Sequence, residues 1–336
     1  MRRAWIALLF LVCAAAAGAQ TSAVPPKQDS PKPDASAPQA STQNPIRVQV
    51  NLVNILFTVT DKKGRTVSNL GKDDFHVFED GQAQTIGFFS RETDLPLRIG
   101  VLIDTSNSVS ERLHFEEEAA IDFLSEAIRP GKDMAFIVGF DVEPQLVQDY
   151  TDDVEKLSNA IRGLAAGGTT SLYDALYYAC QQKMLNLSDP NASGSAEPYL
   201  RRVLILVSDG KDTNSGRSRD EALEMGERSE AIIYAISTNN SGTNTAGSAT
   251  PNGYTSGDKI LKYLAGETGG RVFFPFEASD LESNFREIAS ELRSQYSLAY
   301  TPTNNKRDGS FRKISIETDQ KSLRVRAKTG YFAPSK

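Results

Sequence analysis

The sequence is poor in the residues that most often build catalytic centres and cross-links. It contains two histidines and two cysteines in 336 residues. His76 lies in a strand-like region and His114 in a helical one, so we expect neither a histidine-based triad nor a histidine metal site. Cys13 lies in an N-terminal segment that export would remove, which would leave Cys180 without a disulfide partner. We expect Cys180 to be a small core residue.

The sequence also has no excess of basic residues over acidic ones. The chain has 37 Lys and Arg against 43 Asp and Glu, and its formal net charge is -6. The basic residues form no stripe along the sequence, so we expect no nucleic-acid surface.

A long apolar run is missing as well, because residues 5–17 are too few for a comfortable membrane span. Arg2 and Arg3 precede this run, and Ala17-Gly18-Ala19 follows it as a small-x-small cleavage site. We predict a signal peptide at residues 1–19 and no transmembrane span after its cleavage. The protein would be exported and be periplasmic, on the cell surface or secreted. A retained N-terminal anchor is the alternative.

Several enzyme motifs are absent too. No Gly-rich dinucleotide or phosphate loop opens a helical segment. The tripeptide Asp104-Thr105-Ser106 lacks the glycine of an aspartic protease and the second aspartate of a haloacid-dehalogenase-type phosphatase. We therefore do not expect an enzyme.

The two ends of the folded chain have the alternation of β-strands. Residues 20–45 are a linker rich in Pro, Ser and Ala, with little to bury. Residues 46–94 contain about four strands separated by turns, too small a core for an independent domain. Residues 296–336 alternate in the same way. We predict that 46–94 and 296–336 pack together as a small β-sandwich.

The middle of the chain, residues 95–295, alternates strands with helices, which predicts an α/β fold with a doubly wound, mostly parallel sheet. Apolar runs typical of buried strands occupy residues 97–103, 134–140, 203–207 and 231–236. We expect an antiparallel edge strand at 145–150. We expect helices at 111–129, 152–164, 171–187, 258–267 and 279–293. Residues 187–199 and 239–256 are polar loops.

Oxygen-bearing side chains follow two of these buried strands. Asp104 ends the first strand, and Ser106 and Ser108 come directly after it. Asp209 ends a later strand in the sequence Ser-Asp-Gly. Because ligands of open α/β sheets bind beyond the carboxyl ends of the strands, the two carboxylates can converge. Carboxylate and hydroxyl oxygens suit Mg²⁺, which accepts few protein ligands and keeps several waters.

These motifs together resemble a known family. Asp104-x-Ser106-x-Ser108, then Thr169 after a Gly pair, then Asp209 resembles the von Willebrand factor type A (VWA) domain over residues 95–295. The resemblance implies a metal-ion-dependent adhesion site made of these five residues, holding Mg²⁺, with Mn²⁺ or Ca²⁺ as alternatives. In such a site Ser106 and Ser108 would bind the ion directly, and Thr169 and Asp209 directly or through water.

The N-terminal flank carries a second resemblance. Val59-x-Asp61-x-x-Gly64, followed by residues 74–81 as Asp-Phe-x-Val-x-Glu-Asp-Gly, is similar to a secreted VWA family of acidobacteria.

The family resemblance implies a function in adhesion or protein binding. An acidic side chain of a protein partner would replace one water on the bound ion and join the two molecules. One alternative is a structural or assembly subunit of the envelope, in which the metal only stabilises the fold. A less favoured alternative is a metal-dependent hydrolase.

Overall fold

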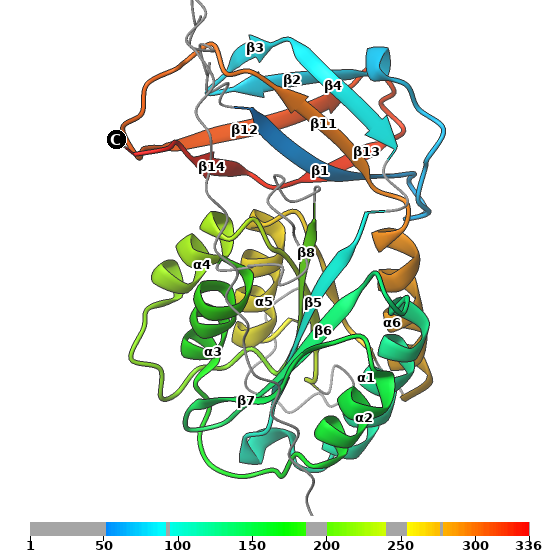
Figure 1. Cartoon of the computed structure of the whole chain (residues 1–336), viewed down its shortest axis with the longest axis vertical. Helices are drawn as coiled ribbons and strands as arrows, with labels where there is room; N and C mark the ends of the chain where they lie inside the picture. Colours follow the sequence, from blue (N-terminus) through cyan, green and yellow to red (C-terminus); the bar gives the residue numbers. More distant parts are fainter. Residues whose placement is uncertain (1–51, 92–94, 186–199, 240–253, 276–277, 336) are drawn as a thin grey trace, which may run out of the picture. The chain divides into compact units, whose positions relative to one another are not determined.

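A six-stranded sheet forms the centre of the fold (Figure 1). The computed structural model describes residues 52–91, 95–185, 200–239, 254–275 and 278–335. The strand order is β10-β9-β8-β5-β6-β7, and only β7 runs antiparallel to its neighbour. The strands are β5 (Leu97–Asp104), β6 (Met134–Phe140), β7 (Pro144–Thr151), β8 (Arg201–Ser208), β9 (Ile232–Ser237) and β10 (Val272–Phe273). All eight residues of β5 are buried, as expected of a strand covered on both faces.

Helices cover both faces of this sheet (Figure 1). One face carries α1 (Leu113–Ala127), α2 (Val154–Arg162) and α6 (Ala278–Leu292); the other carries α3 (Leu172–Tyr178), α4 (Arg219–Arg228) and α5 (Ser256–Glu267). Successive strand side chains point to opposite faces. Val101 of β5 therefore packs into the α1, α2 and α6 core, and Leu102 into the core under α3, α4 and α5.

The helix predictions hold in part. Four of the expected helices are present, with ends that differ by about one or two residues. The segment expected as one helix from residue 171 is instead α3 followed by a π-helix, Ala179–Met184. Helix α4 was not predicted, although Ser218 and Glu221 form a capping box at its start. Cys180 is fully buried, as expected of a core residue.

Strands from both flanks form a β-sandwich beside the central sheet. Its two antiparallel sheets have the orders β13-β1-β11-β4 and β14-β12-β2-β3. The strands are β1 (Val53–Thr60), β2 (Phe75–Glu79), β3 (Gln82–Gln84), β4 (Ile86–Arg91), β11 (Tyr296–Tyr300), β12 (Phe311–Thr318), β13 (Arg324–Ala327) and β14 (Gly330–Phe332). The fold-class prediction is confirmed, because β1 from one flank pairs with β11 and β13 from the other. Strands β3 and β14 were not predicted.

Glu291 of α6 connects the sandwich to the central sheet. Its carboxylate accepts hydrogen bonds from Thr58 of β1 at 3.1 Å, from Tyr234 of β9 at 2.5 Å and from Arg326 of β13. Residues 49–336 form one unit. The domain boundaries at 94/95 and 295/296 stay a prediction.

Several predictions concern residues outside the described part of the chain. These are the signal peptide at 1–19, the linker at 20–45, the first residues of the N-terminal strand region, and most of the two polar loops. Within the described ranges, we find no helix with both the length and the apolar character needed to cross a membrane.

Candidate metal centre at the carboxyl end of the sheet

The predicted site lies where the strand order reverses. Strand β5 pairs with β6 on one side and with β8 on the other. The connection after β5 therefore leads to β6 on one side, and β8, later in the chain, is added on the other side. Connections diverge there and open a crevice beyond the strand ends. Asp104 is the last residue of β5, and Asp209 directly follows β8. The topology therefore brings together two acids that are 105 positions apart.

Asp104 is buried and oriented by hydrogen bonds. Ser208 Oγ donates to its Oδ2 at 2.7 Å, and the Ser106 backbone N–H donates to its Oδ1 at 3.0 Å. Burial raises the pKa of Asp104 above its ordinary value, and the charge of Asp209 adds to this, although the two hydrogen bonds oppose it. Asp104 is thus a preorganised acid that a nearby cation would stabilise in its charged form.

The two predicted serine ligands lie side by side. Ser106 Oγ and Ser108 Oγ are 2.9 Å apart, with Ser106 buried and Ser108 exposed in the short 3₁₀ helix Asn107–Val109. The structure therefore presents two hydroxyl oxygens directly after the Asp104 carboxylate.

Backbone contacts hold the loop of Thr169 against this segment. The Gly167 N–H donates to the Thr105 carbonyl at 2.7 Å, and the Asn107 N–H donates to the Gly168 carbonyl at 3.4 Å. Gly168 has φ +71, and a Cβ there would lie 2.9 Å from the Val142 side chain, so the turn favours glycine. Thr169 itself is exposed.

Asp209 is buried and paired with a lysine that sequence analysis did not single out. Lys211 donates to it twice, from the backbone N–H to Oδ1 and from Nζ to Oδ2, both at 2.9 Å. The Lys211 side chain is 54% exposed. A partly exposed ammonium thus already pairs with one of the two acids.

A cavity of about 270 Å³ opens at the site. Ser108, Asp209 and Lys211 line it, together with Arg112 and residues 238–239. Asp104, Ser106 and Thr169 are not part of its lining. Ser106 adjoins a lining residue, because its Oγ lies 2.9 Å from Ser108 Oγ, and its backbone N–H donates to Asp104.

Asn239 was expected to be ordinary loop sequence, which is wrong. Its Nδ2 donates to the Asp209 carbonyl at 2.8 Å and to Asp258 Oδ1 at 2.9 Å. It thereby links the strand end that carries Asp209 to the start of α5. No local pattern signalled this role.

Glu116 of α1 was also missed, because it begins a run of three glutamates that is typical of a solvated helix face. It is 1% exposed, and neither carboxylate oxygen has a hydrogen-bond partner. Burial raises the pKa of Glu116 to about 8; the Arg112 guanidinium opposes this shift, while the charges of Asp104 and Asp209 reinforce it.

The donor set fits a hard divalent cation. Two carboxylates, two adjacent hydroxyls and the excess negative charge around Asp104 favour a bound cation. In the described part of the chain, no three His, Cys, Asp or Glu side chains form a group that could hold a metal. An ion here would therefore depend on hydroxyl oxygens and water as well as on acids.

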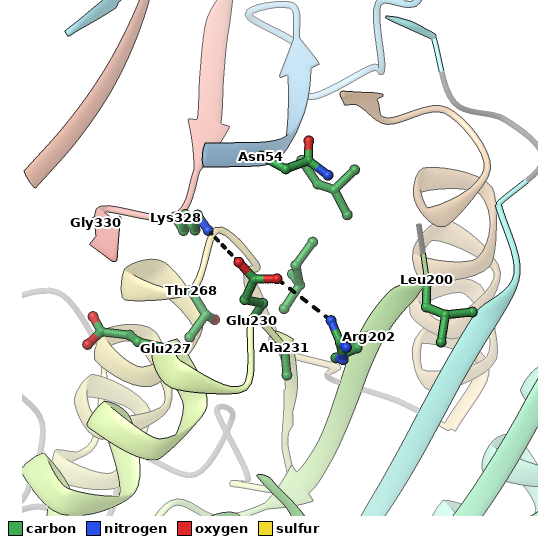
Figure 2. A pocket seen from close by; sticks show the side chains of 11 residues that line it. Asn54, Leu200, Arg202, Glu227, Glu230, Ala231, Thr268, Lys328 and Gly330 are labelled. Carbon is green, nitrogen blue, oxygen red and sulfur yellow. Dashed lines mark hydrogen bonds and ion pairs between the residues drawn. The ribbon is translucent and has the colours of Figure 1, made fainter. Parts of the chain in front are cut away.

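A second cavity, shown in Figure 2, lies at the opposite ends of the strands. It measures about 50 Å³ and is lined by residues at the starts of β8 and β9 and by residues of the sandwich. Glu230 lies between Arg202, at 3.7 Å, and Lys328, at 3.5 Å (Figure 2). Glu230 is paired with two basic side chains and the volume suits only a water or two, so we do not assign a function to this cavity.

Comparisons with known proteins agree with the motif. The model of the von Willebrand factor type A domain matches residues 99–211. No curated protein matches the chain. The finer resemblance to a secreted acidobacterial family stays a prediction.

Three solved structures are similar to this chain. A von Willebrand factor type A protein from Catenulispora acidiphila is 12% identical, with a TM-score of 0.47 and coverage of 78% of this chain and 74% of that one. The D319A mutant of the PilB minor pilin from Streptococcus sanguinis is 12% identical, with a TM-score of 0.41 and coverage of 60% and 62%. Proximal thread matrix protein 1 from the mussel byssus, with a zinc-occupied MIDAS motif, is 16% identical, with a TM-score of 0.45 and coverage of 64% and 50%. The chain spans less than two thirds of the pilin and of the byssus protein. These likenesses are weak, so among the comparisons only the match over residues 99–211 bears on the family.

Proposed function

We propose, from the von Willebrand factor type A domain that the chain carries at residues 99–211, that this protein is a cation-dependent binding module. A divalent cation, Mg²⁺ by preference, is held by Asp104, Ser106, Ser108, Thr169 and Asp209. A protein partner offers a carboxylate to that ion. The protein acts outside the cytoplasm, as an exported adhesion or protein-binding component.

The observation that carries this proposal is the convergence of Asp104 and Asp209 at the switch point, beside a cavity lined by Ser108. Neutral hydroxyls and two acids leave positions around a divalent cation to water, and an acidic group can replace water there. The bound ion would supply a localised positive charge for that acidic group. The side chains of this domain hold the ion, and the cavity admits the partner.

The placement of the two histidines supports a binding function over catalysis. His76 lies in the sandwich and contacts Asp319 at 3.2 Å, and His114 is 79% exposed and contacts Glu117 at 3.7 Å. Neither histidine lines the cavity beside Asp209, so neither is placed to act as a general base there. We propose that the protein is not an enzyme.

The first test is cation binding by the Asp104→Asn variant. Mg²⁺ or Mn²⁺ should raise the melting temperature of the wild-type protein, and this rise should be lost in the variant because one of two anionic ligands is gone. Asp122→Asn, an exposed position on α1, is the matched control and should keep the rise. An equal response of Asp104→Asn and the wild type would contradict the assignment of the site.

The second test addresses the partner. Immobilised protein should retain an envelope protein in Mg²⁺ and release it on addition of EDTA, and Asp209→Asn should retain much less. Binding that is indifferent to EDTA would favour the alternative of a structural or assembly subunit with a merely stabilising metal.

A further inference from the structure

Glu116 is a buried acid that the five-residue site does not use. It lies in the first turn of α1, which begins five residues after Ser108. It is 1% exposed, and both of its carboxylate oxygens lack a hydrogen-bond partner. Burying a carboxylate without a partner is costly, so ordinary packing does not account for this residue.

The adjacent glutamates of the same run behave differently. Glu117 lies 3.7 Å from His114, and Glu118 lies 3.4 Å from Arg162. Each has a partner of opposite or titratable charge, as expected on a helix face. Glu116 therefore differs from both neighbours in having no partner, although Glu117 is also largely buried.

The charges that act on Glu116 are those of the candidate metal centre. Asp104 and Asp209 are both close enough to repel its charge, and Arg112, one turn earlier on the chain, attracts it. The Arg112 guanidinium also donates to the Thr238 carbonyl at 2.8 Å. Thr238 Oγ1 is itself buried without a partner and belongs to a residue that lines the cavity. Two unpartnered polar groups thus adjoin the same site.

We propose that Glu116 is a positioning residue of this site, whose carboxylate accepts a hydrogen bond from a water bound to the cation. The inference rests on the proposed function. Glu116 acts through water and is no direct ligand, because the described residues contain no group of three acidic side chains that could hold a metal. Its negative charge strengthens the hold on a divalent ion, and the ion in turn relieves the repulsion among Glu116, Asp104 and Asp209.

This role predicts that Glu116→Gln, in the full-length chain, is more stable without metal than the wild type but binds the cation more weakly. The variant keeps the shape but removes the charge. Its melting temperature without added metal should rise at pH values above the Glu116 pKa of about 8, because a buried unpaired charge is then gone. Its dissociation constant for Mn²⁺, measured by the EPR signal of free Mn²⁺, should rise about tenfold or more, as is typical when a residue that orients metal ligands is changed. Glu116→Asp keeps the charge and should bind Mn²⁺ more tightly than Glu116→Gln.

Glu117→Gln is the matched control and should change Mn²⁺ affinity little. Equal Mn²⁺ affinity in Glu116→Gln and wild type would overturn this inference and leave the proposed function intact. A fall in both melting temperature and affinity would also overturn it, because that result indicates a purely structural role. Absence of saturable Mn²⁺ binding in the wild type would overturn the proposed function and this inference together.

Discussion

The ion pair between Lys211 and Asp209 affects how tightly the candidate metal centre can bind a cation. The ammonium and a bound divalent cation compete for the same carboxylate oxygen, since Nζ lies 2.9 Å from Asp209 Oδ2. Because the Lys211 side chain is more than half exposed, its pairing is weak and reversible. Lys211 therefore lowers the affinity for metal without blocking it.

Replacing this lysine tests the competition. We expect Lys211→Met to bind Mn²⁺ more tightly than the wild type by up to about fivefold, because an exposed pair contributes about 1 kcal/mol or less. Isothermal titration calorimetry measures the change, with Lys156→Met on α2 as the control. A weaker affinity in Lys211→Met would mean that the lysine supports the metal-bound form.

The individual ligands were predictable to different degrees. Asp104, Ser106, Ser108 and Asp209 stand at strand ends that the apolar pattern marks, so their convergence follows from the topology of the sheet. Glu116 and Asn239 carry no such signal, because their burial and hydrogen bonds depend on residues far away in the chain. The metal-ligand role of all five predicted residues stays a prediction.

Asp133 joins three elements on one side of the sheet. Its fully buried carboxylate accepts hydrogen bonds from the Leu97 backbone at the start of β5 at 2.8 Å and from Arg129, just past α1, at 2.7 Å. Arg293, just past α6, donates to it at 2.9 Å. Burial alone would raise the pKa of Asp133, but these hydrogen bonds outweigh it and lower the pKa to about 2.

Asp133→Asn should therefore destabilise the protein and change its response to acid. A folded pKa below that of the unfolded chain stabilises the protein fully above about pH 4, and this contribution disappears as the pH falls toward 2. We expect Asp133→Asn to lose about 2 kcal/mol of unfolding free energy at pH 7 and to depend less on pH between 4 and 2. Urea unfolding across this range measures both effects, and Asp122→Asn should behave like the wild type. A variant with wild-type stability at pH 7 would show that the arginines find other partners.

Local sequence patterns predicted some of the helices and missed others. The apolar spacing of α1 and α6 indicated them correctly, because each buries one face in a large core. Helix α4 is short, with strongly charged flanks, and only its capping box marks it. The π-helix after α3 places Cys180 and Met184 in the core, a choice that depends on the packing of the surrounding helices.

The whole fold depends on strands from opposite ends of the chain. Strand β1 lies between β11 and β13, and the Phe57 ring stacks on Tyr296 with centroids 5.2 Å apart. The sandwich is also tied to the central sheet through Glu291. Neither flank has a complete core alone.

Cleaving the N-terminal flank tests this dependence. If residues 46–94 are removed by limited proteolysis between β4 and β5, the remaining chain should lose cooperative unfolding and aggregate, because half of the sandwich core is exposed. Size-exclusion chromatography and thermal unfolding follow the outcome. Phe57→Ala should lower the unfolding free energy by about 3 to 5 kcal/mol in the uncut chain. A remainder that stays monomeric with an unchanged melting temperature would contradict the shared sandwich.

The sequence by itself determined the alternation of strands and helices, the acids and hydroxyls at strand ends, and the β character of both flanks. These features are local, since apolar periodicity and turn residues act within a few positions along the chain. The tertiary structure alone decided that Lys211 pairs with Asp209, that Glu116 is buried beside two other acids, and that β1 joins β11 and β13. Such contacts depend on how distant segments pack, because burial and charge pairing arise only when the chain is folded.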